Sequence, residues 1–257
     1  MTTGFAAVPF DVPLVNPAPN GLFGVVNWAD EPGALRWLTA GVDFRVWNYG
    51  GDAGSGEWTP AWNVAEADLT ADDVKRGERP DFPDSFLAVT TWASDDCDLR
   101  PPSQDEIKTR AQQTFRLQEP LVVEAKFAER LLADAGSTGS AADITSAVGQ
   151  LEALLAKTNT LGVIHAGAQW AAVASTAQLI VRSGSVLKTP LGHTWAFGGG
   201  YVDGLGDTLV ATSPLFGWRG TVNADDAPSY KYEEFLAVAE RSLVVGYEAS
   251  VGAVEIS

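Results

Sequence analysis

The chain is poor in the residue types that most enzyme and metal sites use. It has one cysteine, Cys97, and two histidines, His165 and His193, among 257 residues. A single cysteine excludes an intrachain disulfide and any cysteine-rich metal site. The two histidines lack the H-x-x-x-H spacing of a zinc-binding helix. Each stands at the end of an expected strand, and we interpret it as a structural hydrogen-bonding group or an exposed ring.

Basic residues are scarce as well. The chain has 17 Lys and Arg against 33 Asp and Glu, which gives a formal net charge of −16. A protein that binds nucleic acid through its phosphates normally carries a basic face, and here only Lys75, Arg76 and Arg79 gather. We interpret the acidity first as a source of solubility. A second interpretation is that the acidic groups repel nucleic acid, whose phosphates carry charge of the same sign.

Long hydrophobic runs are also lacking. Runs such as Leu121–Val123 and Leu243–Val245 are far shorter than the roughly 20 residues of a membrane-spanning helix. The first residues, MTTGFAAVPF, show no basic head before an apolar core, so neither a signal peptide nor a transit peptide is expected. A cytosolic origin is the default expectation.

Catalytic and ligand-binding motifs are lacking too. No G-x-S-x-G elbow occurs, and the glycines at 198–200 complete neither a dinucleotide nor a P-loop motif, which favours a turn. The paired acids lack the spacing of an EF-hand loop: Asp72–Asp73, Asp95–Asp96 and Asp225–Asp226. We therefore assign no catalytic, cofactor-binding or metal-binding residue. A Ser-His-Asp triad built from distant residues stays open, because such triads are spatial.

What the sequence does contain begins with a proline-rich segment, residues 1–34. Its prolines exclude regular helix and predict an extended or irregular course. Its apolar residues, which include Phe10, Leu14 and Phe23, are too many for a free tail. We expect this arm to lie on its own domain or on a neighbouring subunit.

Two alternating segments, 41–49 and 85–92, predict a pair of strands around a long acidic excursion. Loops of that length usually project or bind something. Trp47, Trp58 and Trp62 cluster in this region. Such rings favour burial in a core or at a subunit interface, and a platform that stacks on sugars is the alternative.

The clearest helix is predicted for residues 103–135. Ser103 and Glu106 form a capping box, and Pro120 must bend or divide the helix. Its expected buried stripe is Ile107, Ala111, Phe115, Val122, Ala125 and Leu132.

A linker at 136–143 and a mixed α/β region follow this helix. We expect helices at 141–157 and 168–180, a strand at 162–165, a hairpin of 186–188 with 194–197, and strands at 209–212 and 215–219. Residues 232–240 predict a short helix or a strand edge, and 242–256 one or two strands.

One stretch carries a resemblance to a known family. It reads GVIHAG at 162–167, then an alanine-rich helix, then GSVLKTPLG at 184–192 and a strand ending in GGGY at Tyr201. This order resembles the major capsid proteins of tailed bacteriophages, of the actinobacterial phage and prophage type, whose fold also builds encapsulin compartments.

The resemblance implies an α+β fold in four parts. These are an N-terminal arm (1–35), an extended loop that lies over an adjacent subunit (36–92), a peripheral domain with a long spine helix (93–138 and 226–257), and an axial domain (139–225).

The function implied is that of a structural subunit, not an enzyme. It would self-assemble through pentamers and hexamers into an icosahedral shell, around double-stranded DNA that it binds without sequence specificity. The location implied is the virion, assembled in the host cytoplasm, with no cofactor and no membrane. Separate scaffold, portal or decoration proteins are candidate partners, and a scaffold, if used, is expected on another chain.

The residues expected at subunit contacts are Phe10, Leu14, Phe23, Trp47, Trp58 and Trp62. No lysine–asparagine pair can be placed for a cross-link, so non-covalent assembly is expected. An encapsulin-like cage and a soluble carbohydrate-binding or hydrolytic protein are the alternatives.

Overall fold

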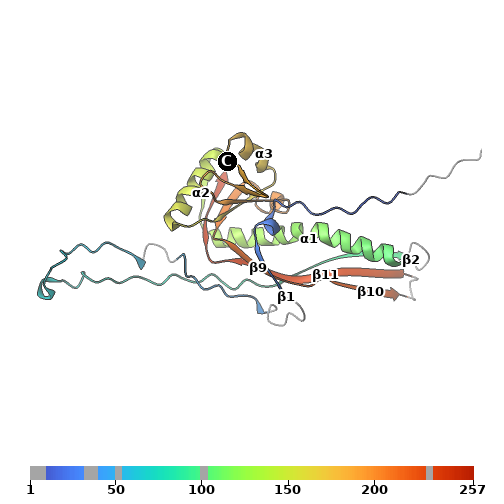
Figure 1. Cartoon of the computed structure of the whole chain (residues 1–257), viewed down its shortest axis with the longest axis horizontal. Coiled ribbons are helices and arrows are strands. Elements are labelled where there is room, and N and C mark those ends of the chain that lie inside the picture. Colours follow the sequence, from blue (N-terminus) through green and yellow to red (C-terminus); the bar gives the residue numbers. More distant parts are fainter. Residues whose placement is uncertain (1–9, 32–39, 50–53, 99–103, 230–233) are drawn as a thin grey trace, which may run out of the picture.

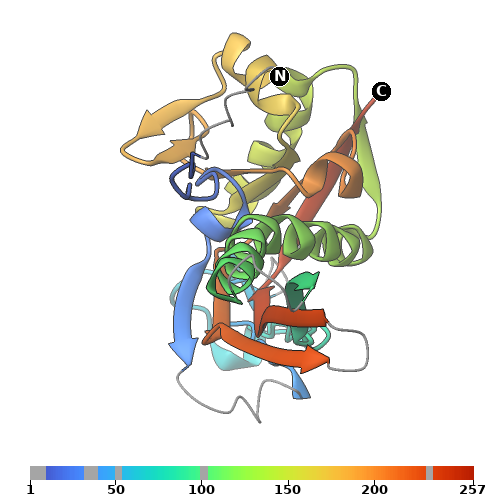
Figure 2. The ribbon, with the colours of Figure 1, turned by 90° about the vertical axis from the view of Figure 1, so that its right-hand side faces the viewer.

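A computed structural model describes residues 10–31, 40–49, 54–98, 104–229 and 234–257. Its architecture is mixed α+β, as predicted, with two β-sheets on opposite sides of one long helix, α1 (Figure 1, Figure 2). An arm leaves this body on one side and a long loop leaves it on the other (Figure 1). The helix therefore forms the centre of the molecule, and the two extensions reach away from it.

The helix α1 (Gln104–Ala135) is continuous through Pro120, so the predicted division does not occur. Its 32 residues span about 48 Å at 1.5 Å per residue. The first half of the expected stripe is buried, but Val122, Ala125 and Leu132 are exposed. The residues buried after Pro120 are Val123, Glu124, Phe127, Ala128 and Leu131. Ser103 of the expected cap lies outside the described residues.

The smaller sheet has five strands in the order β1-β9-β11-β10, with β2 also paired to β11. Their bounds are β1 Asn27–Glu31, β2 Val89–Asp98, β9 Leu215–Gly220, β10 Asn223–Ser229 and β11 Glu234–Tyr247. Phe235, Ala237 and Ala239 alternate along β11 and face α1, where they pack against Ile107 and Phe115. This period-two pattern is typical of a strand with one buried face.

The strand β10 lies at an edge of this sheet. Its described side chains are exposed, and it contains Asp225, Asp226 and Pro228. Charges and proline are the residues that keep an edge strand from pairing with another chain.

The larger sheet has seven strands in the order β3-β12-β8-β4-β7-β6-β5. Their bounds are β3 Thr138–Ala141, β4 Val163–Gly167, β5 Val181–Ser183, β6 Val186–Lys188, β7 Thr194–Gly198, β8 Thr208–Thr212 and β12 Ser250–Ile256. The helices with it are α2 Ile144–Thr158, α3 Trp170–Thr176 and α4 Tyr201–Gly204. Its central strand β4 is buried along its whole length, which explains why its sequence, VIHAG, is apolar or small apart from His165.

Several local predictions are confirmed. The predicted hairpin is β6 and β7, which pair antiparallel at Lys188 and Thr194. The helix α2 begins after Asp143, whose carboxylate accepts the N–H of Ser146 at 2.7 Å, and it buries Ile144, Val148, Leu151 and Leu155. The residues that predict these elements lie close together in the sequence, which explains why prediction and structure agree.

Other local predictions are wrong. Residues 41–49 form no strand beyond one bridge between Val42 and Phe86, because the later amides of this segment bond to a carboxylate instead of a partner strand. The linker at 136–143 contains β3, which pairs parallel with β12. The predicted helix at 168–180 ends at Thr176, since Gln178 adopts a left-handed φ of 59°. The described part of 232–240 belongs to the strand β11.

A buried carboxylate joins α1 to two other parts of the chain. Glu124 is 2% exposed, and its Oε1 accepts the N–H of Leu22, at the base of the arm, at 2.9 Å. Its Oε2 accepts the N–H of Gly200, at the start of α4, at 2.9 Å. One side chain thus joins the central helix to the arm and to the start of α4, which follows the larger sheet's strand β7.

The glycines beside Glu124 make this close approach feasible. A Cβ atom at Gly21 would lie 2.1 Å from the Glu124 Oε1, and one at Gly200 would lie 2.2 Å from the carbonyl oxygen of Leu121. The expected turn at 198–200 therefore surrounds one of the protein's own carboxylates. Burial raises the pKa of Glu124, and the backbone hydrogen bonds oppose that rise.

The base of the long loop is fastened at both of its limbs. On the outgoing limb, the Glu248 carboxylate accepts the backbone N–H groups of Trp47 and Asn48, and the Asn48 side chain donates to it at 2.8 Å. On the returning limb, Arg130 of α1 donates to the carbonyl oxygens of Asp84 and Ser85 at 2.7 and 3.1 Å. The loop therefore leaves the body in a defined direction.

Substitution of Glu124 by alanine is expected to lower the free energy of unfolding by about 3 kcal/mol, because two buried backbone N–H groups lose their acceptor. Chemical denaturation would measure the loss. Glu129→Ala, at an exposed position of the same helix, is the matched control and should change stability little. Equal stability of the two variants would contradict the role assigned to Glu124.

Substitution of Glu248 by glutamine is expected to speed amide hydrogen exchange at Trp47 and Asn48. Burial raises the pKa of Glu248, but the hydrogen bonds from Asn48, Trp47 and Tyr49 outweigh it and hold that pKa below the ordinary 4.5. The tether is therefore present above pH 4.5 and lost as the pH falls through the lowered pKa. Below that pKa, the exchange rates of these two amides, divided by their intrinsic rates, should be the same in the parent and in Glu248→Gln. Glu255→Gln, at an exposed position, is the control and should exchange as the parent does at every pH.

Candidate assembly surfaces

The arm exposes large apolar side chains. Phe10 is 81% exposed and Leu14 is 61% exposed. The chain after them is held on α1, where the Gln113 side chain donates to the Val15 carbonyl at 2.8 Å and Arg116 donates to the Asn16 side chain. Phe10 and Leu14 therefore stay uncovered by their own subunit, as a contact with another subunit would require.

Phe23 is placed differently from the other candidates of the arm. It is half-buried and packs edge-on against Trp28 with ring centroids 5.0 Å apart. The Trp28 indole N–H also donates to the Phe23 carbonyl at 3.1 Å. Phe23 thus contributes to its own subunit's core, and part of its ring remains accessible.

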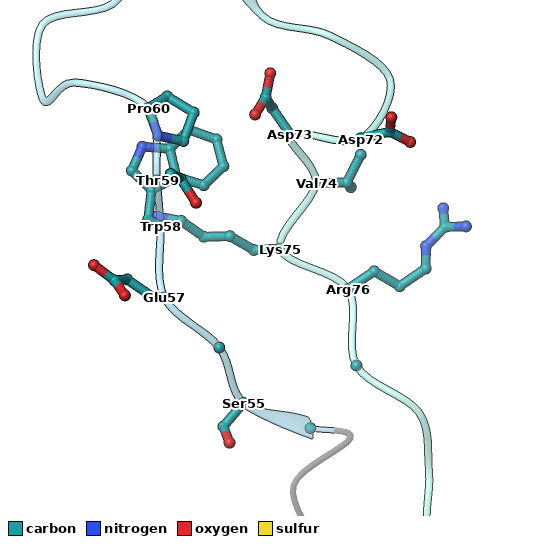
Figure 3. A pocket seen from close by; sticks show the side chains of 13 residues that line it. Ser55, Glu57, Trp58, Thr59, Pro60, Asp72, Asp73, Val74, Lys75 and Arg76 are labelled. Atoms are coloured by element: carbon teal, nitrogen blue, oxygen red, sulfur yellow. The ribbon is translucent and has the colours of Figure 1, made fainter.

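The three loop tryptophans do not form one platform. Trp47 is 80% exposed near the base of the loop, and Trp62 is 99% exposed farther out. Trp58 is half-buried beneath Lys75, whose Nζ lies 4.5 Å from the ring centroid (Figure 3). Among the described residues, no ring contact joins the three side chains. This arrangement disfavours a shared sugar-stacking surface.

The two limbs of the loop enclose a shallow pocket near Trp58. Residues 54–60 line one side and residues 72–77 line the other (Figure 3). Asp73 accepts hydrogen bonds from the backbone and the hydroxyl of Thr70, both at 2.7 Å, and these bonds lower its pKa. The pocket mixes acidic and basic side chains, and we assign it to the folding of the loop tip.

Neither histidine is placed for catalysis. His165 is buried, with Nδ1 at 3.1 Å from the Tyr201 hydroxyl and Nε2 at 3.0 Å from the Thr212 hydroxyl. Burial lowers its pKa to about 3, so the ring is neutral. The His193 Nδ1 accepts the N–H of Gly162 at 3.2 Å. Within the described ranges, neither ring is hydrogen-bonded to a serine hydroxyl, as a triad would require.

The described residues hold no group of three or more His, Cys, Asp or Glu side chains arranged to bind a metal ion. None of the helices they form is long and apolar enough to cross a bilayer.

Sequence analysis missed the buried carboxylates that position the candidate surfaces. Glu119 of α1 forms a bidentate ion pair with Arg241 of β11 and is 4% exposed. Glu119 and Glu124 both fall on the helical period of the buried face. A search for acids at buried helical positions would therefore have found both.

No protein-family model matches the sequence of this chain, and no curated protein matches it, but solved structures match its fold. The capsid of an empty GTA particle matches with 12% identity and a TM-score of 0.57, over 98% of this chain and 94% of that chain. A chain from Microbacterium phage Oxtober96 matches with 9% identity and a TM-score of 0.55, over 100% and 96%.

An encapsulin matches to a similar degree. The SrpI encapsulin complex from Synechococcus elongatus has 11% identity and a TM-score of 0.56, over 97% of this chain and 92% of that chain. Because these matches extend along almost the whole chain, they include the arm and the loop as well as the two sheets. The chain therefore has the fold of tailed-phage major capsid proteins and encapsulins, as the resemblance of its sequence predicts.

Proposed function

We propose that this protein is the structural subunit of an icosahedral shell that encloses a phage double-stranded DNA genome. The observation that carries the proposal is the pair of tethered extensions with uncovered apolar side chains, at Phe10 and Leu14 in the arm and at Trp47 and Trp62 in the loop. Aromatic side chains such as those of Phe and Trp are enriched in the cores of protein–protein interfaces. Both extensions leave a body that has the shell-protein fold.

The two proposed domains each contain one of the two sheets. The peripheral domain would contain α1 and the five-stranded sheet, and the axial domain would contain α2, α3 and the seven-stranded sheet. Strand pairing favours a change to the expected boundaries, because β9 pairs with β11 while β12 pairs with β3 and β8. We therefore place β9 and β10 in the peripheral domain, and β3 and β12 in the axial domain.

The partners proposed are first of all further copies of the chain, as pentamers and hexamers. The enclosed DNA would be confined by the shell wall and would not be bound by sequence-specific contacts, because the chain is strongly acidic. Its location would be the virion after assembly in the host cytoplasm. Scaffold, portal and decoration proteins are proposed as further partners.

An encapsulin-like cage is the second candidate, because the SrpI encapsulin is as similar in fold as the phage capsids are. The two candidates differ in content. A phage shell would hold DNA, whereas an encapsulin-like cage would hold protein.

Negative-stain electron microscopy with light scattering on the same sample tests the proposal. The expected result is closed shells or ring-shaped capsomers of many 27.2 kDa chains. Nuclease-protected DNA inside particles from infected or induced cells would favour the phage shell over the cage. A protein that stays monomeric at all concentrations, with and without a co-expressed scaffold, would contradict both candidates.

Assembled particles are expected to be held together without covalent cross-links. Boiling them in detergent should return a single band of the chain's own mass on a gel. A ladder of multimers that persists after reduction would contradict this expectation.

A further inference from the structure

The five-stranded sheet has a second face, which points away from α1 (Figure 1). On β11, Phe235, Ala237 and Ala239 face the helix, so the residues between them point the opposite way. The strands β2 and β10 pair with β11 on its two sides, and their residues alternate in the same manner. We call six residues of this second face the Trp92 face: Trp92, Asp96, Asp225, Leu236, Val238 and Glu240.

The centre of the Trp92 face is apolar. Trp92 is 67% exposed and Leu236 is 42% exposed, and Val238 is half-buried. Val238 lies diagonally across from Trp92 and two residues from Leu236 on the same strand, so the three side chains are near neighbours. Among the large apolar side chains on the described strands, that of Trp92 is the most exposed. An indole ring is thus left uncovered in the middle of a regular strand.

The apolar centre is surrounded by acids that have no cation beside them. Within the described ranges, none of the three acids of the face forms an ion pair. On the helix side of the sheet, by contrast, Asp226 is paired with Lys108 of α1 at 3.0 Å. Asp95 is paired with Arg110 of α1 at 3.0 Å. Each apolar residue of the Trp92 face lies directly opposite an acid: Trp92 opposite Glu240, Val238 opposite Asp225, and Leu236 opposite Asp96.

This charge selects the kind of molecule that can cover the face. Nucleic acid would be repelled by the acids. Two copies of the chain that met through this face would set acid against acid, which disfavours such a contact. The chain also has only 17 Lys and Arg against 33 Asp and Glu, so its copies supply few cations. A different protein that presents Lys or Arg around apolar side chains is complementary in both respects.

The dimensions of the face suit a helix. Neighbouring strands lie about 4.8 Å apart, so β2 and β10, on the two sides of β11, are about 10 Å apart. An α-helix with its side chains is about 10 to 12 Å wide. A single amphipathic helix can therefore cover the apolar centre and place its cations beside the acids.

We propose that the Trp92 face binds a separate protein through a basic amphipathic helix, with the apolar stripe of that helix over Trp92 and Leu236. The inference rests on the proposed shell function, because it assigns a surface to one of the separate proteins proposed as partners there. Tryptophan is among the residue types that most often anchor interfaces, which gives Trp92 the largest share in the contact.

A defined peptide tests the role of the ring. The probe is a fluorescently labelled helical peptide of about 18 residues, or five turns, with leucine along one stripe and lysine elsewhere. Its anisotropy should report binding to the unassembled chain. Trp92→Thr, which keeps a strand-forming residue, should lower the affinity about tenfold or more. Trp62→Thr is the matched control, because Trp62 is 99% exposed on the loop, and should have little effect. A peptide that does not bind, or equal effects of the two variants, would overturn the proposal.

The same probe tests the role of the acids. Glu240→Lys should lower the affinity about tenfold, because it sets a cation against the lysines of the peptide. Glu129→Lys, at an exposed position of α1, makes the same change of net charge away from the face and should have little effect. Equal weakening by both variants would show that the peptide responds to net charge alone, and would overturn the proposal.

Alkylation tests whether copies of the chain cover the face themselves. In a Cys97→Ala background, Ser94→Cys places a thiol at an exposed position of β2 beside Trp92. In particles that contain this chain alone, iodoacetamide should modify that thiol as fast as in the unassembled chain. Protection in such particles would show that a second copy occupies the face, and would overturn the proposal.

The outcomes separate this inference from the proposed function. Shells that form normally from a chain that does not bind the peptide would overturn the inference and leave the shell function standing. A chain that binds the peptide through Trp92 but never assembles would contradict the shell function and leave the binding surface established.

Discussion

The Glu124 carboxylate is the contact on which the arrangement of the molecule depends. It lies on the central helix and accepts hydrogen bonds from one backbone amide of the arm and from one at the start of α4, just after strand β7 of the larger sheet. A carboxylate in this position costs desolvation, and the raised pKa of Glu124 expresses that cost. The two amides offset it only when all three segments are in place. The fold of each part is therefore coupled to the fold of the others.

The second buried acid of the helix has a related role in the smaller sheet. The ion pair of Glu119 with Arg241 holds α1 to the longest strand, β11. Pro120 lies directly after Glu119 in the sequence, and the helix continues through it. We attribute this continuity to the contacts on both sides of the proline, because a proline in an isolated helix would break it.

Prediction from the sequence succeeded where the signal is local. Short stretches of sequence predict three elements: the helix α2, the hairpin at Lys188 and Thr194, and the strand β4. Prediction failed where an element depends on distant partners. The strands β1 and β3 are short, and they exist because β9 and β12 lie beside them. The expected stripe of α1 was drawn from apolar and small residues alone, and it fails after Pro120 because the buried face includes two acids, Glu119 and Glu124.

The same distinction applies to the candidate surfaces. Phe10, Leu14, Trp47 and Trp62 could be named from the sequence because large apolar residues are conspicuous in segments that lack a regular period. The tethers at Glu248 and Arg130 could not be, since they join segments far apart in the chain.

The guarded edge of the five-stranded sheet has a consequence for the shape of any assembly. Subunits that join by strand pairing at an open edge add without end and form fibres. The acids and the proline of β10 oppose that mode of growth. Contacts between subunits that are made by the arm and the loop would have fixed directions, because both extensions are tethered to the body at their bases. Directional contacts of this kind give a closed particle of finite size where the rotation between neighbouring subunits closes, and a filament where it does not.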